Sequence, residues 1–460
     1  MPGFTVDADY NPYLPVGGQD VSAIVTVTAS REPGGSIVPP PDAGGRAEII
    51  MVDCSGSMDW PPTKITEARA ATSAAIDVLH DGVWFAVIRG TSVALPVYPP
   101  NGTMAVANPL TREEAKRTVA GLRSYGGTAI GEWLRLARQV FTTSPAVLRH
   151  AILLTDGKNQ HEAPQKLGEA IALCEGYFSC DCRGVGTDWE VSEVRRVSTG
   201  LLGTLDIVPD PAGLSADFEE MMRGALRKHL PNVMLRMWIP QRATVKFVRQ
   251  VAPSIEDLTA RRAEAGPQAG DYPTGAWAPG ESRDYHVGIV VPPAGLGQEM
   301  LAARISLVAG SPPGPPGVPG SFGMPGPFGA SGPFGMPGPS GQAVLGQGMI
   351  PVTWTENESL STPISARVAH YTGQAELATA IADGLEAHKR GDAEIATVRL
   401  GKAVRLAHEA GNEETAGLLS KVVDVVDEAT GTVRLKRKVD VADEMALDTR
   451  SVKTVRVKKG

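Results

Sequence analysis

The chain has 460 residues, of which 42% are hydrophobic and 21% charged, so its length exceeds what one hydrophobic core organises and two or three domains are expected. Its formal net charge of −7 gives no electrostatic reason to expect a nucleic acid or an anionic membrane as partner. No apolar run approaches the roughly 20 residues that cross a bilayer, and the amino-terminal residues lack a charged start followed by an apolar core, so we expect a cytoplasmic protein.

The first segment alternates apolar and polar residues with the two-residue period of a half-buried β-strand. The stretch "DVSAIVTVTAS", residues 20–30, shows this alternation. We therefore assign residues 1–45 to the amino-terminal strands of an antiparallel β-sandwich that is completed later in the chain.

From residue 46 to residue 230, apolar strand-like runs alternate with amphipathic helical stretches. Candidate strands cover residues 47–53, 84–90, 93–99, 150–156, 180–186 and 203–209, and candidate helices begin near residues 63, 111, 128, 164, 190 and 215. The nearly continuous Ile, Leu, Met and Val of the first and fourth runs is expected when helices cover both faces of a mainly parallel sheet. We predict a Rossmann-like α/β domain inserted into the β-sandwich.

Residues 231–356 return to the alternating pattern, with Pro and Gly at the turns, and are predicted to form the rest of the sandwich. Within them, residues 311–347 are rich in Pro and Gly, and "FGMPGP" starts at both Phe322 and Phe334. The segment has no Gly-X-Y period, so we predict a disordered loop, with a proline-motif ligand as the alternative.

The carboxyl-terminal part contains two segments with different residue patterns. Residues 361–430 contain three helical stretches separated at Gly391 and Gly411, which indicates a three-helix bundle. Residues 431–460 carry nine Lys or Arg against four Asp or Glu, and we predict a basic, disordered tail.

Polar side chains gather where two of the apolar runs end. Asp53, Ser55 and Ser57 alternate in "VDCSGSM", Asp156 ends "ILLTD", and Thr128 follows two glycines at a helix start. Ligands bind at the carboxyl ends of the strands in open parallel sheets, so neighbouring strands would bring all five groups to one crevice. Two carboxylates and three hydroxyls suit Mg²⁺; Mn²⁺ and Ca²⁺ are alternatives, although the charge is too low for a tight calcium cage.

This combination resembles the von Willebrand factor type A (VWA) domain and its metal-ion-dependent adhesion site (MIDAS). The resemblance covers residues 46–230, and all five positions of the motif are filled. It implies a protein-binding scaffold in which the metal bridges to an Asp or Glu of a partner, without enzymatic activity. In some members binding is linked to movement of the last helix of the domain, here residues 214–230.

The whole-chain arrangement resembles bacterial, especially actinobacterial, VWA proteins. That resemblance implies a signalling system with kinase, phosphatase and forkhead-associated partners. In the basic tail, Thr449 and Thr454 are therefore candidate phosphorylation sites that would dock a forkhead-associated domain. A solvated tail without this role is the alternative.

Other residues near the motif allow two interpretations each. Trp60 either contacts the partner or packs under its own loop, and His161 either lines the partner surface or is an exposed loop histidine. Cys54 is predicted to point away from the motif as a packed thiol, and Cys180 and Cys182 to be buried in a strand.

The alternative function is a metal-assisted hydrolase or phosphatase that uses the same two aspartates. Such an enzyme needs a general base or nucleophile near the ion. The sequence has no HExxH motif and no paired histidines that would supply one. We therefore predict no catalytic residue.

Overall fold

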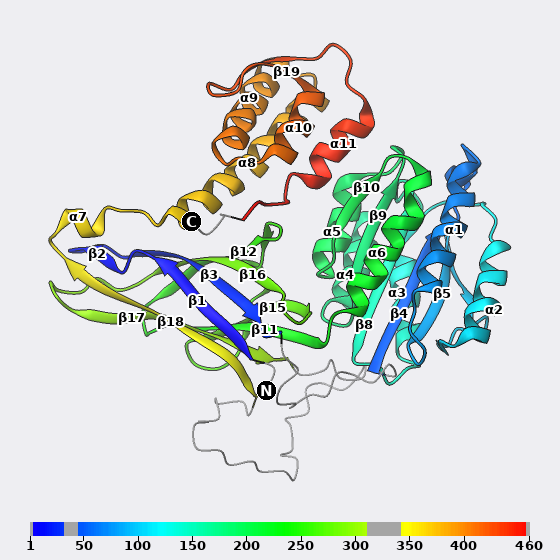
Figure 1. Ribbon diagram of the computed structural model, residues 1–460, viewed down its shortest axis with the longest axis horizontal. Helices are drawn as coiled ribbons and strands as arrows, with labels where there is room; N and C mark the ends of the chain where they lie inside the picture. Colours follow the sequence, from blue (N-terminus) through cyan, green and yellow to red (C-terminus); the bar gives the residue numbers. More distant parts are fainter. Residues whose placement is uncertain (1–2, 32–44, 311–341, 457–460) are drawn as a thin grey trace, which may run out of the picture.

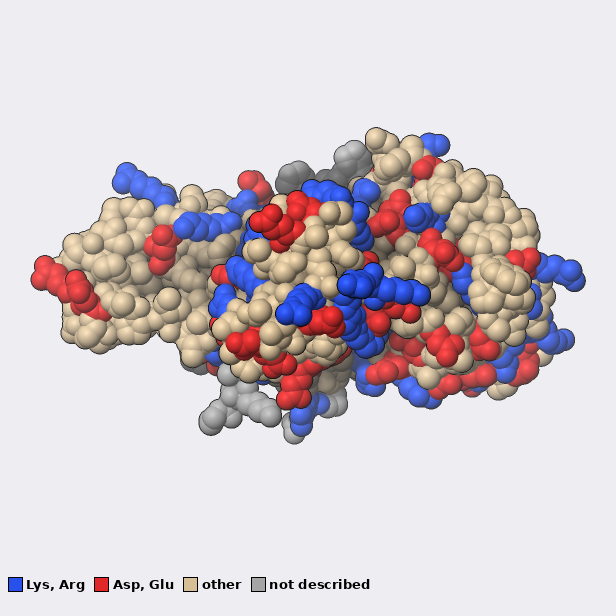
Figure 2. Space-filling model, turned by 90° about the horizontal axis from the view of Figure 1, so that it is seen from above, with Lys and Arg blue, Asp and Glu red and all other residues tan. Residues whose placement is uncertain are grey.

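The computed structural model describes residues 3–31, 45–310 and 342–456. Figure 1 shows an α/β part, a part built from two β-sheets, and a helical part above the sheets. Among the described residues, no helix is both long and apolar enough to cross a membrane. Figure 2 shows acidic and basic side chains interspersed over one face of the molecule, without a broad region of a single sign.

The α/β part contains a central, mostly parallel sheet, as predicted. Its strands are β4 (Arg46–Asp53), β5 (Trp84–Gly90), β6 (Ala94–Tyr98), β7 (Ala105–Val106), β8 (Leu148–Thr155), β9 (Ser179–Val185) and β10 (Leu205–Val208). Their order is β10-β9-β8-β4-β5-β6, with β7 also paired to β5. Only β6 and β7 run antiparallel to their neighbour β5.

Helices cover both faces of this sheet, and they start close to the predicted positions. They are α1 (Thr63–Asp77), α2 (Pro109–Ala120), α3 (Ile130–Phe141), α4 (Pro164–Cys174), α5 (Val191–Gly200) and α6 (Leu214–Leu226), with the short 3-10 helices η2 (Gly56–Asp59) and η3 (Pro211–Gly213) between them. Successive strand residues point to opposite faces. Ile49 therefore packs in the cluster under α3, α4 and α5, whereas Ile50 packs in the cluster under α1, α2 and α6.

Gly90 at the end of β5 leaves room for the ring of a buried tryptophan. A methyl group added at Gly90 would lie 2.3 Å from the ring of Trp133. Gly90→Ala is expected to lower the free energy of unfolding by about 1–3 kcal/mol, because the ring must shift in a packed core. Urea unfolding measures this.

Gly417→Ala is the matched control for the Gly90 variant. Gly417 lies in a helix with open space around it, so alanine is expected to stabilise the protein there by about 0.5–1 kcal/mol. Equal stability of the Gly90 variant and the native protein would contradict the packing argument.

The second part consists of two sheets that share one hydrophobic cluster. One sheet contains β1 (Phe4–Tyr10), β3 (Asp20–Ala29), β16 (Ser282–Val290), β12 (Thr244–Ala252) and β13 (Glu256–Asp257). The other contains β14 (Ala263–Glu264), β15 (Ala269–Trp277), β11 (Leu230–Trp238), β17 (Glu299–Ala309), β18 (Val344–Thr355) and β2 (Tyr13–Pro15), and the 3-10 helix η4 (Thr259–Arg261) lies between β13 and β14 in the chain. The α/β part follows β3 in the chain and precedes β11.

The predicted Pro/Gly-rich loop falls largely outside the described residues, which omit 311–341. Its predicted end at residue 347 is wrong, because β18 already begins at Val344 and pairs with β17.

The carboxyl-terminal part contains α7 (Glu358–Ser361), α8 (Ala366–Lys389), α9 (Ala393–Glu409), α10 (Glu413–Val422), the hairpin β19 (Val423–Asp427) and β20 (Thr432–Leu435), and α11 (Val441–Arg450). The third predicted helix was expected to reach residue 430 but ends at Val422. The following run "VDVVD" is rich in β-branched valine, which favours the strand that forms instead.

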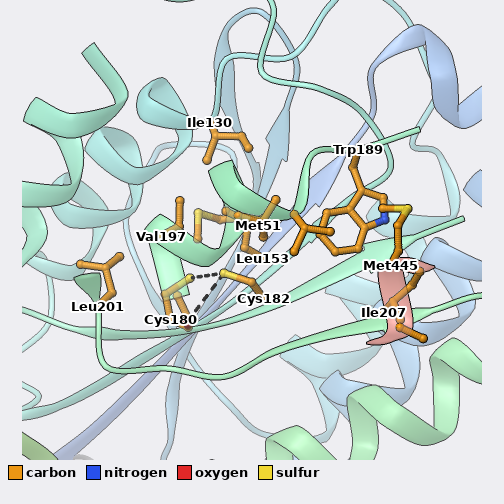
Figure 3. Packing of buried hydrophobic residues seen from close by; sticks show 14 of the residues in the cluster. Met51, Ile130, Leu153, Cys180, Cys182, Trp189, Val197, Leu201, Ile207 and Met445 are labelled. Atoms are coloured by element: carbon orange, nitrogen blue, oxygen red, sulfur yellow. Dashed lines mark hydrogen bonds between the residues drawn. The ribbon is translucent and has the colours of Figure 1, made fainter. Parts of the chain in front are cut away.

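The prediction of a disordered tail from residue 431 is wrong for its described part, residues 431–456. Asp440 caps α11 by accepting a hydrogen bond from the Ala442 amide, and Met445 and Leu447 are buried. Figure 3 places Met445 in the same buried cluster as Trp189 of the α/β part. The segment is ordered because its apolar side chains complete that core.

Two basic residues of this segment are paired with an acid of the α/β part. Arg450 and Lys453 both bind Asp206 of β10, with N–O distances of 2.8 Å. Further on, the Ile255 amide donates to the Val452 carbonyl, and the Thr454 amide donates to the Pro253 carbonyl. The carboxyl-terminal segment therefore contacts both the α/β part and the two-sheet part, as its position in Figure 1 indicates.

Candidate functional site

The two aspartates of the predicted motif end neighbouring strands. Asp53 is the last residue of β4, Asp156 follows β8, and the two strands pair in parallel with Val52 opposite Leu154. The strand order departs from β4 in both directions, to β5 on one side and to β8 on the other. This is the switch point at which open α/β sheets form a crevice.

Hydrogen bonds hold the polar side chains of this crevice toward one another. The Ser57 hydroxyl donates to Asp156 Oδ1 at 2.7 Å and lies 2.9 Å from the Ser55 hydroxyl. Asp53 accepts from the Ser55 amide through Oδ1 and from the Thr155 hydroxyl through Oδ2, both at 2.7 Å. Thr155, which the sequence analysis did not single out, thus orients the first aspartate.

Thr128 completes the set from a separate loop. A methyl group added at Gly157 would lie 3.1 Å from both the Ser57 and Thr128 hydroxyls and 3.6 Å from the Ser55 hydroxyl. The three hydroxyls therefore face a common point, beside a glycine whose missing side chain leaves it open. The structure brings the five predicted residues together.

His161 supports the Thr128 loop. Its Nδ1 accepts a hydrogen bond from the Thr128 amide at 3.1 Å, and its own amide donates to the Thr128 carbonyl at 3.0 Å. A methyl group at Gly127 would lie 2.0 Å from its ring. This exposed histidine therefore packs on the loop that carries a site residue.

The loop after β8, which contains His161, also binds the first amides of α3. Asn159 Oδ1 accepts from the Ile130 amide at 2.8 Å, and Glu162 Oε1 accepts from the Gly131 amide at 2.7 Å. These contacts satisfy amides that a helix start leaves unpaired. Thr128 lies just before α3, and Asp156 lies at the start of the loop after β8. These contacts therefore fix the positions of Thr128 and Asp156 relative to each other.

The structure places the side chain of Trp60 at the surface and that of Cys54 in the core. Trp60 is 79% exposed, so it does not pack under its own loop. Cys54 is buried in the core below α1, as predicted, and burial raises the pKa of its thiol to about 12. Cys180 and Cys182 are likewise buried, in β9.

Lys64 is the main site residue that the sequence analysis missed. Its Nζ lies 2.8 Å from Asp156 Oδ2 and 3.1 Å from Asp188 Oδ2, and its side chain is 4% exposed. A lysine in the first turn of α1 opposes the helix dipole. That misfit was the available signal that Lys64 has an acidic partner.

The electrostatics of the site balance two buried acids against one buried cation. Burial and the nearby Asp156 raise the pKa of Asp53 to about 6. Burial also raises the pKa of Asp156, although hydrogen bonds from Lys64 and Ser57 oppose the shift. Burial lowers the pKa of Lys64, but its hydrogen bonds to Asp156 and Asp188 make the net shift upward.

The donor set fits a hard divalent cation. Across the described part of the chain, no group of three or more His, Cys, Asp or Glu is placed to hold a metal ion. The crevice instead combines two carboxylates with three hydroxyl oxygens. Mg²⁺ accepts one or two carboxylates with neutral oxygen ligands, so the residues present fit it.

A cavity of about 590 Å³ lies elsewhere, between α6, β9 and the two-sheet part. Several of its charged residues already pair with one another, such as Arg183 with Asp217 and Lys453 with Asp206. The strand-end crevice therefore remains the candidate site.

Comparison with known proteins gives a consistent result. Residues 49–158 match the model of the von Willebrand factor type A domain, and residues 405–451 match that of the von Willebrand factor type A C-terminal domain. The structure of a von Willebrand factor type A protein from Catenulispora acidiphila shares 44% identity over 99% of this chain and 98% of its own, with a TM-score of 0.87. The crystal structure of the ArnB paralog VWA2 from Sulfolobus acidocaldarius, at 11% identity, 98% coverage of both chains and a TM-score of 0.55, shows likeness of fold alone. No curated protein sequence matches the chain.

Proposed function

Because this chain belongs to the von Willebrand factor type A family, we propose that its strand-end crevice is a complete MIDAS that binds Mg²⁺ and, through the ion, an Asp or Glu of a protein partner. The observation that carries the proposal is the convergence of the Ser55, Ser57 and Thr128 hydroxyls beside Gly157 and the two buried aspartates.

The chain's own residues divide the work of holding the ion. Ser55, Ser57 and Thr128 provide neutral oxygens, whereas Asp53 and Asp156 provide charge. When bound, the ion supplies an electrophilic position that a partner carboxylate can take. Because Lys64 already neutralises part of the acidic charge, the ion retains more of its attraction for that carboxylate.

The rim of the crevice supplies contact area for a partner. Trp60 is 79% exposed and follows η2 directly, and Tyr125, 47% exposed, lies in the loop that leads to Thr128. Exposed aromatic residues of this kind often anchor protein interfaces. The proposed role of His161 is to position Thr128, whose amide donates a hydrogen bond to it.

Binding is proposed rather than catalysis because the titratable groups beside the crevice are already engaged. Lys64 is paired with two aspartates, and His161 uses Nδ1 to accept from the Thr128 amide. Turnover of p-nitrophenyl phosphate that disappears in Asp156→Ala would replace this proposal with the hydrolase alternative.

The cellular setting is also part of the proposal: a cytoplasmic scaffold within a kinase, phosphatase and forkhead-associated signalling system. Docking of a forkhead-associated domain on phosphorylated Thr449 or Thr454 requires that a kinase can reach their hydroxyls. The Thr449 hydroxyl is buried and donates to the Met445 carbonyl, and the Thr454 hydroxyl donates to the Val251 carbonyl. A kinase reaches these hydroxyls only after the segment detaches.

Ser57→Ala and Thr128→Ala test the site directly. Each is expected to weaken Mg²⁺ binding about tenfold or more, because each removes an oxygen aimed at the ion, and Asp53→Ala is expected to weaken it further. Titration calorimetry with Mg²⁺ measures the affinity, and affinity capture with and without Mg²⁺ measures partner binding.

Thr379→Ala, which removes a hydroxyl on the exposed side of α8, is the control for these variants. It should leave Mg²⁺ affinity and partner capture unchanged. Partner capture that persists in EDTA would overturn the metal-bridged mechanism.

A further inference from the structure

A polar pocket of about 480 Å³ lies beside the proposed metal crevice. Its lining includes Asp59 at the end of η2, Arg69 on α1, and Arg123 and Ser124 in the loop after α2. This loop continues into the rim of the crevice.

Two backbone hydrogen bonds join the pocket to the crevice. The Tyr125 amide donates to the Cys54 carbonyl at 2.8 Å, and the Gly56 amide donates to the Gly126 carbonyl at 2.9 Å. Cys54 and Gly56 alternate with Asp53, Ser55 and Ser57 along the motif. A partner segment lying on the crevice would therefore also lie next to the pocket.

The pocket has cationic groups without anionic partners. Within the described residues, neither Arg69 nor Arg123 forms an ion pair, and Asp59 does not pair with them. The Arg69 guanidinium donates to the Leu122 carbonyl through Nη2. Arg69 Nε and the Ser124 hydroxyl oxygen are buried and have no hydrogen-bond partner among the described atoms.

These two atoms have almost no accessible surface, so an acceptor in the pocket reaches them only when the side chains turn toward it. A buried polar atom left without a partner costs about 1–3 kcal/mol, and such atoms are uncommon in folded proteins. A guanidinium group binds a carboxylate through charge-assisted hydrogen bonds, and a serine hydroxyl adds a further donor. Two arginines against one aspartate leave the lining with net positive charge.

We propose that this pocket binds a second carboxylate of the partner segment whose first carboxylate coordinates the metal. The partner is then an acidic peptide segment with two carboxylates a few residues apart. This inference rests on the proposed function, since it takes the metal site as the anchor for the first carboxylate. It adds the class of sequence that the site selects.

Fluorescently labelled Gly/Ser peptides of two kinds test the proposal. One peptide contains a single Asp, and three others contain an Asp followed by a Glu at three different spacings. Fluorescence anisotropy in Mg²⁺ measures their binding to the full chain. At the best spacing, the peptide with two carboxylates is expected to bind about tenfold more tightly than the peptide with one, which corresponds to one charge-assisted contact.

Arg123→Gln should remove most of that tenfold advantage without changing the affinity of the single-carboxylate peptide. Because Arg123 is exposed and forms no ion pair among the described residues, this change is not expected to affect folding. Ser124→Ala provides a second, uncharged test of the same pocket. Arg434→Gln, an exposed arginine on β20, controls for the change in net charge.

The outcomes separate the two proposals. If no two-carboxylate peptide binds more tightly in Mg²⁺ than the single-carboxylate peptide, or if Arg123→Gln weakens both kinds of peptide to the same degree, the second-carboxylate site is wrong while the metal site stands. If no peptide binds in Mg²⁺, and Mg²⁺ itself does not bind by calorimetry, the proposed function fails with it.

Discussion

Replacing His150 by leucine is expected to lower the free energy of unfolding by about 3–5 kcal/mol, because the change leaves buried acids without their cation. His150 on β8 lies between two acids on the adjacent strands. Its Nδ1 is 2.7 Å from Glu48 Oε2 on β4, and its Nε2 is 3.0 Å from Asp181 Oδ2 on β9. Glu48 and His150 are buried in the first halves of β4 and β8, whereas the crevice lies at the ends of these strands.

The same group predicts how stability depends on pH. Burial lowers the pKa of His150, but Glu48 and Asp181 raise it more, to about 9 overall. The folded state therefore binds this proton more tightly than the unfolded state, whose pKa is about 6.5. The contribution is complete below about pH 6.5 and is lost as the pH rises through about 9, on the order of 3 kcal/mol in all.

The acids define the other end of the pH window. Hydrogen bonding and charge from His150 hold the pKa of Asp181 well below its usual range, despite its burial. Its contribution is therefore present above the unfolded pKa of about 3.9 and is lost at lower pH. Together the groups predict their largest stabilisation between about pH 4 and pH 6.5.

Urea unfolding from pH 6 to pH 10 checks the effect of the substitution and the loss of stability at alkaline pH, and unfolding from pH 2 to pH 6 checks the contribution of Asp181. The native protein should lose stability from pH 6 to pH 10, and the loss should be much smaller in His150→Leu. His388→Gln is the control, because His388 pairs with Glu444 in a more exposed setting and should cost no more than about 1 kcal/mol. If His150→Leu fails to fold, Glu48→Gln, which keeps a hydrogen-bonding group, should still flatten the pH dependence.

Replacing Lys64 by methionine is expected to raise the affinity for Mg²⁺ at least tenfold and to destabilise the metal-free protein. The ammonium group is held 2.8 Å from Asp156 Oδ2, so it opposes a cation bound at the same carboxylate. Removing a unit charge about 5 Å from a divalent ion is worth roughly 6 kcal/mol at an effective dielectric constant of about 20, so a tenfold gain is a lower bound. This prediction rests on the proposed metal site.

Stability without metal should change in the opposite direction. In EDTA, Asp156 of the Lys64→Met protein would be buried without its cation, which costs about 3–5 kcal/mol. Added Mg²⁺ should then stabilise the variant more than it stabilises the native protein. Calorimetric titration and urea unfolding, each with and without Mg²⁺, measure the two effects.

Asp188→Asn separates the roles of the two partners of Lys64. The Asp188 side chain is 67% exposed, so its loss should cost no more than about 1 kcal/mol. An unchanged Mg²⁺ affinity in Lys64→Met would show that the ammonium group does not oppose the ion.

Local sequence signals were strong in the α/β part. Its strands are apolar on both faces, and its helices are amphipathic, so each element was visible in the pattern of residues next to it. The five site residues were also visible, because polar side chains interrupt apolar runs where strands end. The tail was misjudged because its charge was counted without the buried positions of Met445 and Leu447 and without the acid that pairs with Arg450.

Periodicity and strand-end polarity are local properties, so the mainly parallel α/β sheet and the motif residues at its strand ends could be predicted from the residues alone. The pairing of Lys64 with Asp156, the two acids on either side of His150, and the pocket that Arg69 and Arg123 share became visible in the folded chain. These pairings join residues that are distant in the chain, and their energies depend on burial and on distances of a few ångströms.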